Sequence, residues 1–214
     1  SRAVAVGGQV LTIKTPKDTY EEIFLPLHGK HQASNAAAAL VAVEAFFGEQ
    51  ELDYEAVLAG FANVQSPGRC EVLHRDPTII IDAAHNPHGA KAITETIQNE
   101  FTFDEVIGVV AAMGDKDVQG ALVEFEKVLD SIIVTKNSSS RSMPVAEIEK
   151  IATSIFGADR VFAADNLEAA IEKAIKDSVR PLSEDTLGIL ITGSVVTVGE
   201  ARTIVRKRFA KEGA

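Results

Sequence analysis

Seven consecutive residues, Asp82-Ala83-Ala84-His85-Asn86-Pro87-His88, gather a carboxylate, two imidazoles and an amide. A carboxylate that follows a strand can accept hydrogen bonds from ribose hydroxyls, as it does in dinucleotide sites. An imidazole can orient a carboxylate or an amine. Because Pro87 suits the first turn of a helix, the spacing predicts a strand-to-helix turn that points Asp82 and His85 at one ligand.

Two other interpretations of this segment stay open. Asp82 or Asn86 could be a helix N-cap, with the histidines in solvent. Asp82, His85 and His88 are also permissible zinc ligands. Their spacing is not the helical H-E-x-x-H pattern, however, and no second group of Cys or His residues supplies a fourth ligand.

Three further positions could bind parts of a nucleotide or an amino acid. Arg69, in Pro67-Gly68-Arg69, could form paired hydrogen bonds to phosphate. Asn35, near the start of an alanine-rich helix, could pair with the edge of an adenine. Ser194 precedes the last helix, where free N–H groups favour a carboxylate or a phosphate. A surface arginine, an ordinary helix start and a capping turn are the alternatives.

Strands and helices alternate along the chain from about residue 70 onward. The expected strands are rich in Val and Ile and cover residues 70–74, 78–81, 106–110, 131–135, 160–162 and 188–191, with helices after residues 87, 116, 144, 166 and 195. This order predicts an α/β fold, a mostly parallel, doubly wound Rossmann-like sheet of about six strands, one of them antiparallel.

Polar residues follow four of these strands. They are Asp82 to Asn86, Gly114 to Asp117, Lys136 to Ser138 and Thr192 to Ser194. Ligands of such sheets bind at the carboxyl ends of the strands, so we expect the four loops to converge on one cleft. The alternative is that these loops are polar only because they are solvated.

The N-terminal part has a different pattern. Short β-branched runs predict two or three antiparallel strands within residues 4–27, and helical patterns cover residues 31–47 and 53–61. Turn-forming residues at 63–69 then indicate a linker. The strands within residues 4–27 are too few to fold alone. We expect a small α+β part at residues 1–65 and a larger domain at residues 66–214.

Composition excludes several classes of protein. The 214 residues carry 21 Lys and Arg against 31 Asp and Glu, a net charge of −10, which argues against a nucleic-acid partner. Cys70 is the single cysteine, so a disulfide scaffold is excluded and the cytoplasm is favoured. No apolar run approaches the roughly 20 residues that span a membrane. The chain begins at Ser1 rather than Met, so we expect part of a longer protein.

Three sequence motifs are absent. The chain has no G-x-x-x-x-G-K-[ST] loop for ATP phosphates, no complete G-x-G-x-x-G after a strand and no G-x-S-x-G elbow. The sequence therefore provides no phosphate-binding P-loop of its own and argues against a serine hydrolase.

The ordered motifs resemble those of the Mur ligase superfamily, and within it the folylpolyglutamate synthase and dihydrofolate synthase branch. His31-Gln32 with Asn35-Ala36 is similar to the H-Q-x-x-N-A helix of that family, Pro67-Gly68-Arg69 to its interdomain P-G-R, and Asp82 to Pro87 to its D-x-A-H-N-P. The Gly114 to Asp117 loop and Thr192 to Ser194 resemble the folate branch in particular.

The resemblance implies a role for each candidate residue. It places Asn35 on adenine, Arg69 on a nucleotide phosphate and Asp82 on the ribose. It places His85, as catalytic residue and ligand, and Ser194 near the incoming L-glutamate. No metal ligand is implied in this chain, because the family's P-loop and its Mg²⁺ ligands belong to an N-terminal ATPase part. The resemblance implies that only the C-terminal remnant of that part, residues 1–65, is present here.

The implied activity is an ATP-dependent ligation through an acyl phosphate, which adds L-glutamate to folates and to dihydropteroate. ATP and Mg²⁺ are the implied cofactors, and the missing ATPase domain and small-molecule substrates are the implied partners of a monomeric enzyme. We expect the chain alone to be inactive. A cell-wall amino-acid ligase of the Mur type and a non-catalytic nucleotide-binding module are the alternatives.

Overall fold

The computed structural model describes residues 1–48, 50–178 and 186–210. These residues form two compact units, Ser1–Pro67 and Gly68–Ala214. Each unit has a core of its own and is described separately. Within the described ranges no helix is both long and apolar enough to cross a membrane.

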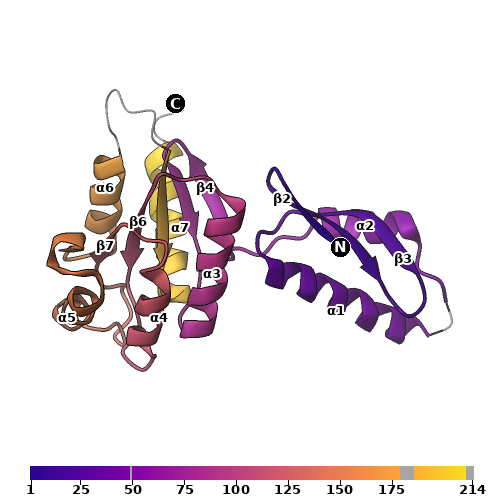
Figure 1. Ribbon diagram of the computed structural model, residues 1–214, viewed down its shortest axis with the longest axis horizontal. Helices are drawn as coiled ribbons and strands as arrows, with labels where there is room; N and C mark the ends of the chain where they lie inside the picture. Colours follow the sequence, from indigo (N-terminus) through magenta and orange to yellow (C-terminus); the bar gives the residue numbers. More distant parts are fainter. Residues whose placement is uncertain (49, 179–185, 211–214) are drawn as a thin grey trace. The chain divides into compact units, whose positions relative to one another are not determined.

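The first unit is an antiparallel sheet accompanied by two helices (Figure 1). The strands pair in the order β1-β2-β3, and alternate residues of β2, such as Leu11 and Ile13, are buried, as expected for a half-buried strand. Asp53 caps the second helix by accepting a hydrogen bond from the backbone N–H of Glu55 at 3.0 Å. The elements are β1 (Arg2–Ala5), β2 (Gly8–Lys14), β3 (Thr19–Leu25), α1 (Lys30–Phe47) and α2 (Tyr54–Ala62).

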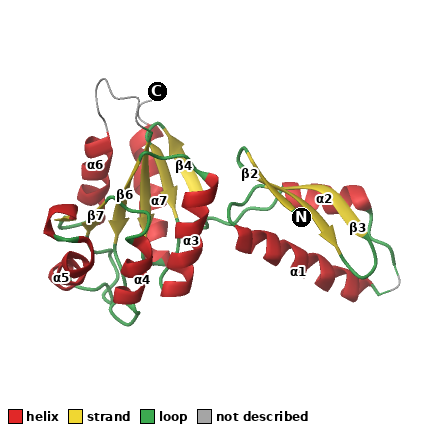
Figure 2. Cartoon of the chain, viewed as in Figure 1, coloured by secondary structure: helices red, strands yellow, loops and turns green. Residues whose placement is uncertain are grey.

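The second unit alternates strands and helices, which Figure 2 shows in yellow and red. Its first elements are β4 (Glu71–Arg75), β5 (Thr78–Ile81), α3 (Pro87–Glu100), β6 (Glu105–Val110), α4 (Val118–Phe125) and β7 (Ser131–Val134). They are followed by α5 (Val145–Phe156), a short 3-10 helix (Ala158–Arg160), β8 (Val161–Ala163), α6 (Leu167–Ser178), β9 (Leu187–Thr192) and α7 (Val195–Ala210).

The six strands of this unit form one sheet in the order β4-β5-β9-β6-β7-β8. Strand β4 pairs antiparallel with β5, and the other pairs are parallel. The predicted α/β class and the sheet of six strands with one antiparallel member are therefore confirmed. The last strand of the sequence, β9, is inserted between β5 and β6, so the strand order reverses at this point.

Successive strand residues face opposite sides of the sheet, and each side has its own hydrophobic core. Ile80, Val110 and Leu190 pack with α3, α4 and α5. Ile79, Ile81 and other intervening residues pack with α6 and α7 on the other face. Helices cover both faces of the sheet (Figure 1), so the polar loops lie at the ends of the strands.

Candidate functional site

The loops that follow β5, β6 and β9 are tied together at the carboxyl edge of the sheet. The backbone N–H of Gly193 donates to the carbonyl of Ala84 at 3.1 Å, and the N–H of Ala111 donates to the carbonyl of Thr192 at 3.2 Å. The turn between β9 and α7 therefore lies between the other two loops. This is the point where the strand order reverses, and open α/β sheets bind their ligands there.

Asp82 begins the loop after β5 and is 8% exposed. Its two carboxylate oxygens accept hydrogen bonds from the backbone N–H groups of Cys70 and Ala84, both at 2.8 Å. Burial raises the pKa of Asp82, and these two hydrogen bonds, Arg69 and His85 act in the opposite direction. Each carboxylate oxygen has a second lone pair, so the group can still accept a hydrogen bond from a ligand.

Arg69 is presented by a tight turn at the start of the second unit. The residues on either side have positive φ angles, +75° at Gly68 and +45° at Cys70. A side chain at position 68 would place its Cβ 2.6 Å from Cγ1 of Val198, so only glycine fits there. Cys70 is buried and Arg69 is exposed. The turn therefore buries the thiol and directs the guanidinium to solvent.

His85 is half-buried, and its Nδ1 lies 2.9 Å from the carbonyl oxygen of Ala83. A carbonyl only accepts hydrogen bonds, so Nδ1 carries the proton and Nε2 of a neutral ring is the acceptor. His85 lines a small, mostly apolar pocket together with Lys116, from the loop after β6, and Gly193, from the turn after β9. The ammonium group of Lys116 lies 3.7 Å from a carboxylate oxygen of Asp115. Three strand ends that are distant in sequence thus contribute residues to the lining of one pocket.

For Asn86 and His88 the structure agrees with the N-cap alternative: Asn86 caps a helix, and His88 is exposed to solvent. The side-chain oxygen of Asn86 accepts a hydrogen bond from the backbone N–H of Gly89 at 2.8 Å, and Pro87 is the first residue of α3. His88 is exposed in the first turn of this helix. In the part of the chain that the structure describes, no three His, Cys, Asp or Glu side chains gather as a metal site.

Ser194 is buried, with an exposed fraction of 3%. Its Oγ lies 3.2 Å from Nδ2 of Asn137 and 3.0 Å from the backbone N of Thr197. Sequence reasoning placed Asn137 at the same edge of the sheet without giving it a role. The available signal was a polar loop after a strand, which does not distinguish a buried amide from a solvated one.

Asn35 belongs to the first unit and lies in the second turn of α1. It is exposed, and its Nδ2 donates to the side-chain oxygen of the buried Gln32 at 3.2 Å. The other four candidate residues, Arg69, Asp82, His85 and Ser194, all belong to the second unit.

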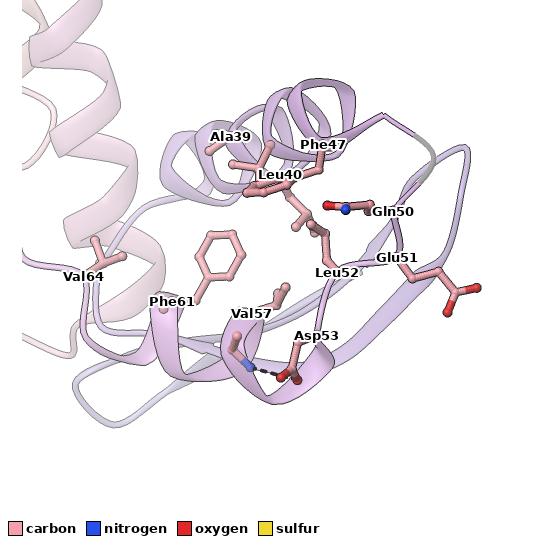
Figure 3. Close-up of a pocket in the computed structure, with 13 residues that line it drawn as sticks. Ala39, Leu40, Phe47, Gln50, Glu51, Leu52, Asp53, Val57, Phe61 and Val64 are labelled. Carbon is pink, nitrogen blue, oxygen red and sulfur yellow. Dashed lines mark hydrogen bonds between the residues drawn. The ribbon is translucent and has the colours of Figure 1, made fainter.

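The first unit contains a cavity of its own. It has a volume of about 480 Å³ and lies between α1 and α2 (Figure 3). Leu40, Val57 and Phe61 are among its lining residues. None of the candidate residues lines it, and its walls are mostly apolar, so it offers little for phosphate or amino-acid chemistry.

Comparison with known proteins gives the family. Residues 68–195 match the family model described as Mur ligase, glutamate ligase domain. The chain belongs to the Mur ligase family. The match covers β4 to β9 and reaches the first residue of α7, so it includes all four strand-end loops of this Mur ligase domain.

The individual relatives of this Mur ligase chain have folate-related names. It is 49% identical to the dihydrofolate synthase/folylpolyglutamate synthase of Mycobacterium tuberculosis, over 95% of this chain and 44% of that protein. It is 30% identical to the enzyme of the same name from Escherichia coli, over 89% of this chain and 41% of that protein. The chain thus spans less than half the length of these relatives.

A solved structure shows the same fold. The folylpolyglutamate synthase of Mycobacterium tuberculosis, complexed with ADP and AMPPCP, superposes with a TM-score of 0.91, at 49% identity, over 96% of this chain and 47% of that one. The chain is therefore a homologue of the C-terminal part of folylpolyglutamate/dihydrofolate synthases, as its motifs predicted.

Proposed function

We propose that this chain is the C-terminal part of an ATP-dependent ligase that adds L-glutamate to folates. Dihydropteroate is included as a second acceptor, because the relatives are also named dihydrofolate synthases. The observation that carries the proposal is the joining of the loops after β5, β6 and β9, which brings Asp82, His85 and the Gly193 turn to one edge of the sheet within a glutamate ligase domain.

The proposed reaction has two steps. The γ-phosphoryl group of ATP passes to the acceptor carboxylate, which gives ADP and an acyl phosphate. The amine of L-glutamate then attacks the acyl carbon, and phosphate leaves as the amide bond forms. Such chemistry depends on positioning and on neutralising phosphate charge rather than on a protein nucleophile.

The described side chains suit particular parts of these substrates. Asp82 has lone pairs left for ribose hydroxyls, and the exposed Arg69 can pair with phosphate. The ammonium group of Lys116 suits a substrate carboxylate. Nε2 of His85 is the proposed acceptor of a proton from the attacking amine. We assign the β9–α7 turn with Ser194 to the binding of L-glutamate, and Asn35, a residue of the first unit, to the binding of adenine.

The same proposal includes Mg²⁺ held by another part of the protein. Since the described residues contain no group of three metal-binding side chains, we assign no ligand in this chain and no step to the ion. The rest of the ATP site is likewise assigned to the N-terminal part that the relatives have. The single cysteine is in keeping with a cytoplasmic enzyme.

Substitution of Asp82 by Ala tests the nucleotide role in a protein of the relatives' full length. We expect the KM for ATP to rise about tenfold, since a hydrogen bond to a charged group contributes about 1.5 to 3 kcal/mol. The measurement is initial-rate kinetics with ATP as the varied substrate. Asp159→Ala is the matched control. This exposed aspartate lies in the 3-10 helix before β8, the outermost strand on the far side of the sheet from β5.

Unchanged ATP kinetics in Asp82→Ala would remove Asp82 from the nucleotide site. The acceptor is tested separately, by competition between a reduced folate, dihydropteroate and a cell-wall peptide precursor. Turnover of the peptide precursor alone would contradict the folate assignment and favour a cell-wall ligase.

A further inference from the structure

Ser194, Thr197 and Asn137 form a buried group of polar side chains at the carboxyl edge of the sheet. All three are nearly inaccessible, with exposed fractions of 3%, 0% and 6%. Asn137 comes from the loop after β7, whereas Ser194 and Thr197 come from the start of α7, 57 and 60 residues further along the chain. Strand β6 lies between β7 and β9, so Asn137 reaches past the end of β6.

The orientation of the Asn137 amide is fixed by its neighbours. Its Oδ1 accepts a hydrogen bond from the backbone N–H of Ser139 at 3.0 Å. A backbone N–H can only donate, so the amide cannot be flipped. The two N–H bonds of Nδ2 then point to Oγ1 of Thr197 at 2.9 Å and Oγ of Ser194 at 3.2 Å.

The direction of each hydroxyl hydrogen bond follows from the same logic. Oγ1 of Thr197 lies 2.7 Å from the carbonyl oxygen of Ala111, which can only accept, so the threonine proton goes there. The 2.8 Å contact between the two hydroxyls must then have Ser194 as its donor.

Ser194 consequently has no hydrogen-bonding capacity left. Its one proton is given to Thr197, and its two lone pairs accept from Nδ2 of Asn137 and from the backbone N–H of Thr197. A hydroxyl has one donor and two acceptor positions. This hydroxyl cannot also bind a substrate without giving up a buried hydrogen bond.

The three buried side chains also hold the turn between β9 and α7, which faces the candidate site. Gly193, the neighbour of Ser194, has a φ of +111°, and a Cβ there would lie 2.6 Å from the carbonyl oxygen of Ala111. Its N–H is bonded to the carbonyl of Ala84, next to His85. Gly193 and His85 line the same small pocket, so a shift of the turn moves the wall of that pocket.

We propose that Asn137 is a positioning residue for the amino-acid half of the site. Ser194 is part of the same hydrogen-bonded scaffold and is not a direct ligand of the amino acid. The inference rests on the proposed function and deepens it. Asn137 acts on the incoming amino acid by fixing the turn that carries Gly193, and it leaves the nucleotide half, at Asp82 and Arg69, largely unaffected.

The test uses a protein of the relatives' full length and compares Asn137→Ala, Ser194→Ala and the double variant. We expect each single variant to raise the KM for L-glutamate about tenfold, because each loses buried hydrogen bonds, while the KM for ATP changes by less than about twofold. The double variant should be no worse than the poorer single variant, since residues of one network are not additive.

Two matched pairs separate positioning from general damage. Thr197→Ser keeps the hydroxyl and should keep the wild-type KM for L-glutamate, whereas Thr197→Val should reproduce the defect of Asn137→Ala. Asn99→Ala removes an exposed amide that bonds only within α3, and it should change neither constant. If Asn137→Ala does not fold, Asn137→Asp keeps the acceptor oxygen and removes both donors, and the same glutamate defect is expected.

Three results would overturn the inference. If the double variant of Asn137 and Ser194 raised the KM for L-glutamate by the product of the two single-variant factors, Ser194 would bind the amino acid by itself. Equal losses for ATP and L-glutamate would show a general structural role. If a double variant of Asn137→Ala and Thr197→Val lowered the melting temperature by the sum of the two single effects, the two side chains would not be coupled in one network. This last readout needs no activity, so it stands even if the wild-type protein lacks glutamate-dependent turnover and the proposed function fails.

Discussion

Cys70 shows how one residue serves both the turn and the candidate site. Its backbone N–H donates to the Asp82 carboxylate, and its thiol is buried at an exposed fraction of 3%. Burial and the nearby Asp82 raise the pKa of the Cys70 thiol. The native fold therefore holds this cysteine in its neutral form.

The raised pKa of Cys70 predicts a loss of stability in alkali. In the unfolded chain the thiol ionises at about pH 8.5, whereas in the folded chain it ionises only at higher pH. The stabilising contribution is therefore complete below about pH 8.5 and is lost as pH rises above that value. Urea unfolding of the wild type and of Cys70→Ala across this range measures the effect.

The control for this prediction is the difference between the two proteins, because other groups that ionise in alkali are common to both. We expect the wild type to lose stability relative to Cys70→Ala as the pH rises. A constant difference between the two proteins would mean that the thiol is not protected. Alkylation of the native thiol should also be at least about tenfold slower than alkylation in urea.

The candidate residues differ in how far sequence could predict their surroundings. The turn that carries Asp82 and His85 could be predicted, because a Val/Ile-rich run ends in a helix-starting Asn-Pro pair. The proximity of His85 to Lys116 depends on the strand order, which local patterns do not specify. Asn137, one of the partners of Ser194, lies 57 residues away in the loop after β7, and only the folded sheet brings the two together.

Helix α3 begins immediately after the candidate residues, and its N-cap holds the end of their loop. The Asn86 side chain accepts the N–H of Gly89. We expect Asn86→Ala to lower the free energy of unfolding by about 1 kcal/mol, the usual effect of removing such a cap. Asn86→Asp keeps the acceptor oxygen and should retain most of the stability.

Chemical denaturation of these variants measures the cap, with Asn99→Ala as the control in the same helix. Asn99 is exposed, and Ala is the better helix former. A similar loss of stability at both positions would show that the amide of Asn86 contributes nothing specific as a cap.

Helix α1 shows the limit of prediction at the level of elements. Its apolar and alanine-rich sequence predicted a helix over residues 31–47, and the structure has one at Lys30–Phe47. A helix that is apolar on all sides is usually buried, yet Val41, Val43, Phe46 and Phe47 are exposed in the described unit. Sequence pattern shows that this face is apolar, but it does not show what covers it.

The exposed apolar residues of α1 in the first unit agree with the short span of the chain relative to its homologues. The chain covers 44% of the Mycobacterium tuberculosis relative and provides neither a P-loop nor a described metal site. We therefore expect no ATP- and glutamate-dependent product from this chain alone. The same assay on a protein of the relatives' full length is the positive control, and product at full rate from the isolated chain would contradict the composite site.

The order of the strands has a consequence for how the molecule is made. Strand β9, at Leu187–Thr192, fills the gap between β5 and β6, although both of its neighbours precede it by more than half of the second unit. A ribosome releases the chain from its N-terminus, so β5 and β6 emerge with open edges that invite aggregation. The sheet cannot close until β9 has been synthesised, and nascent chains stalled before residue 187 should be readily cut by proteases.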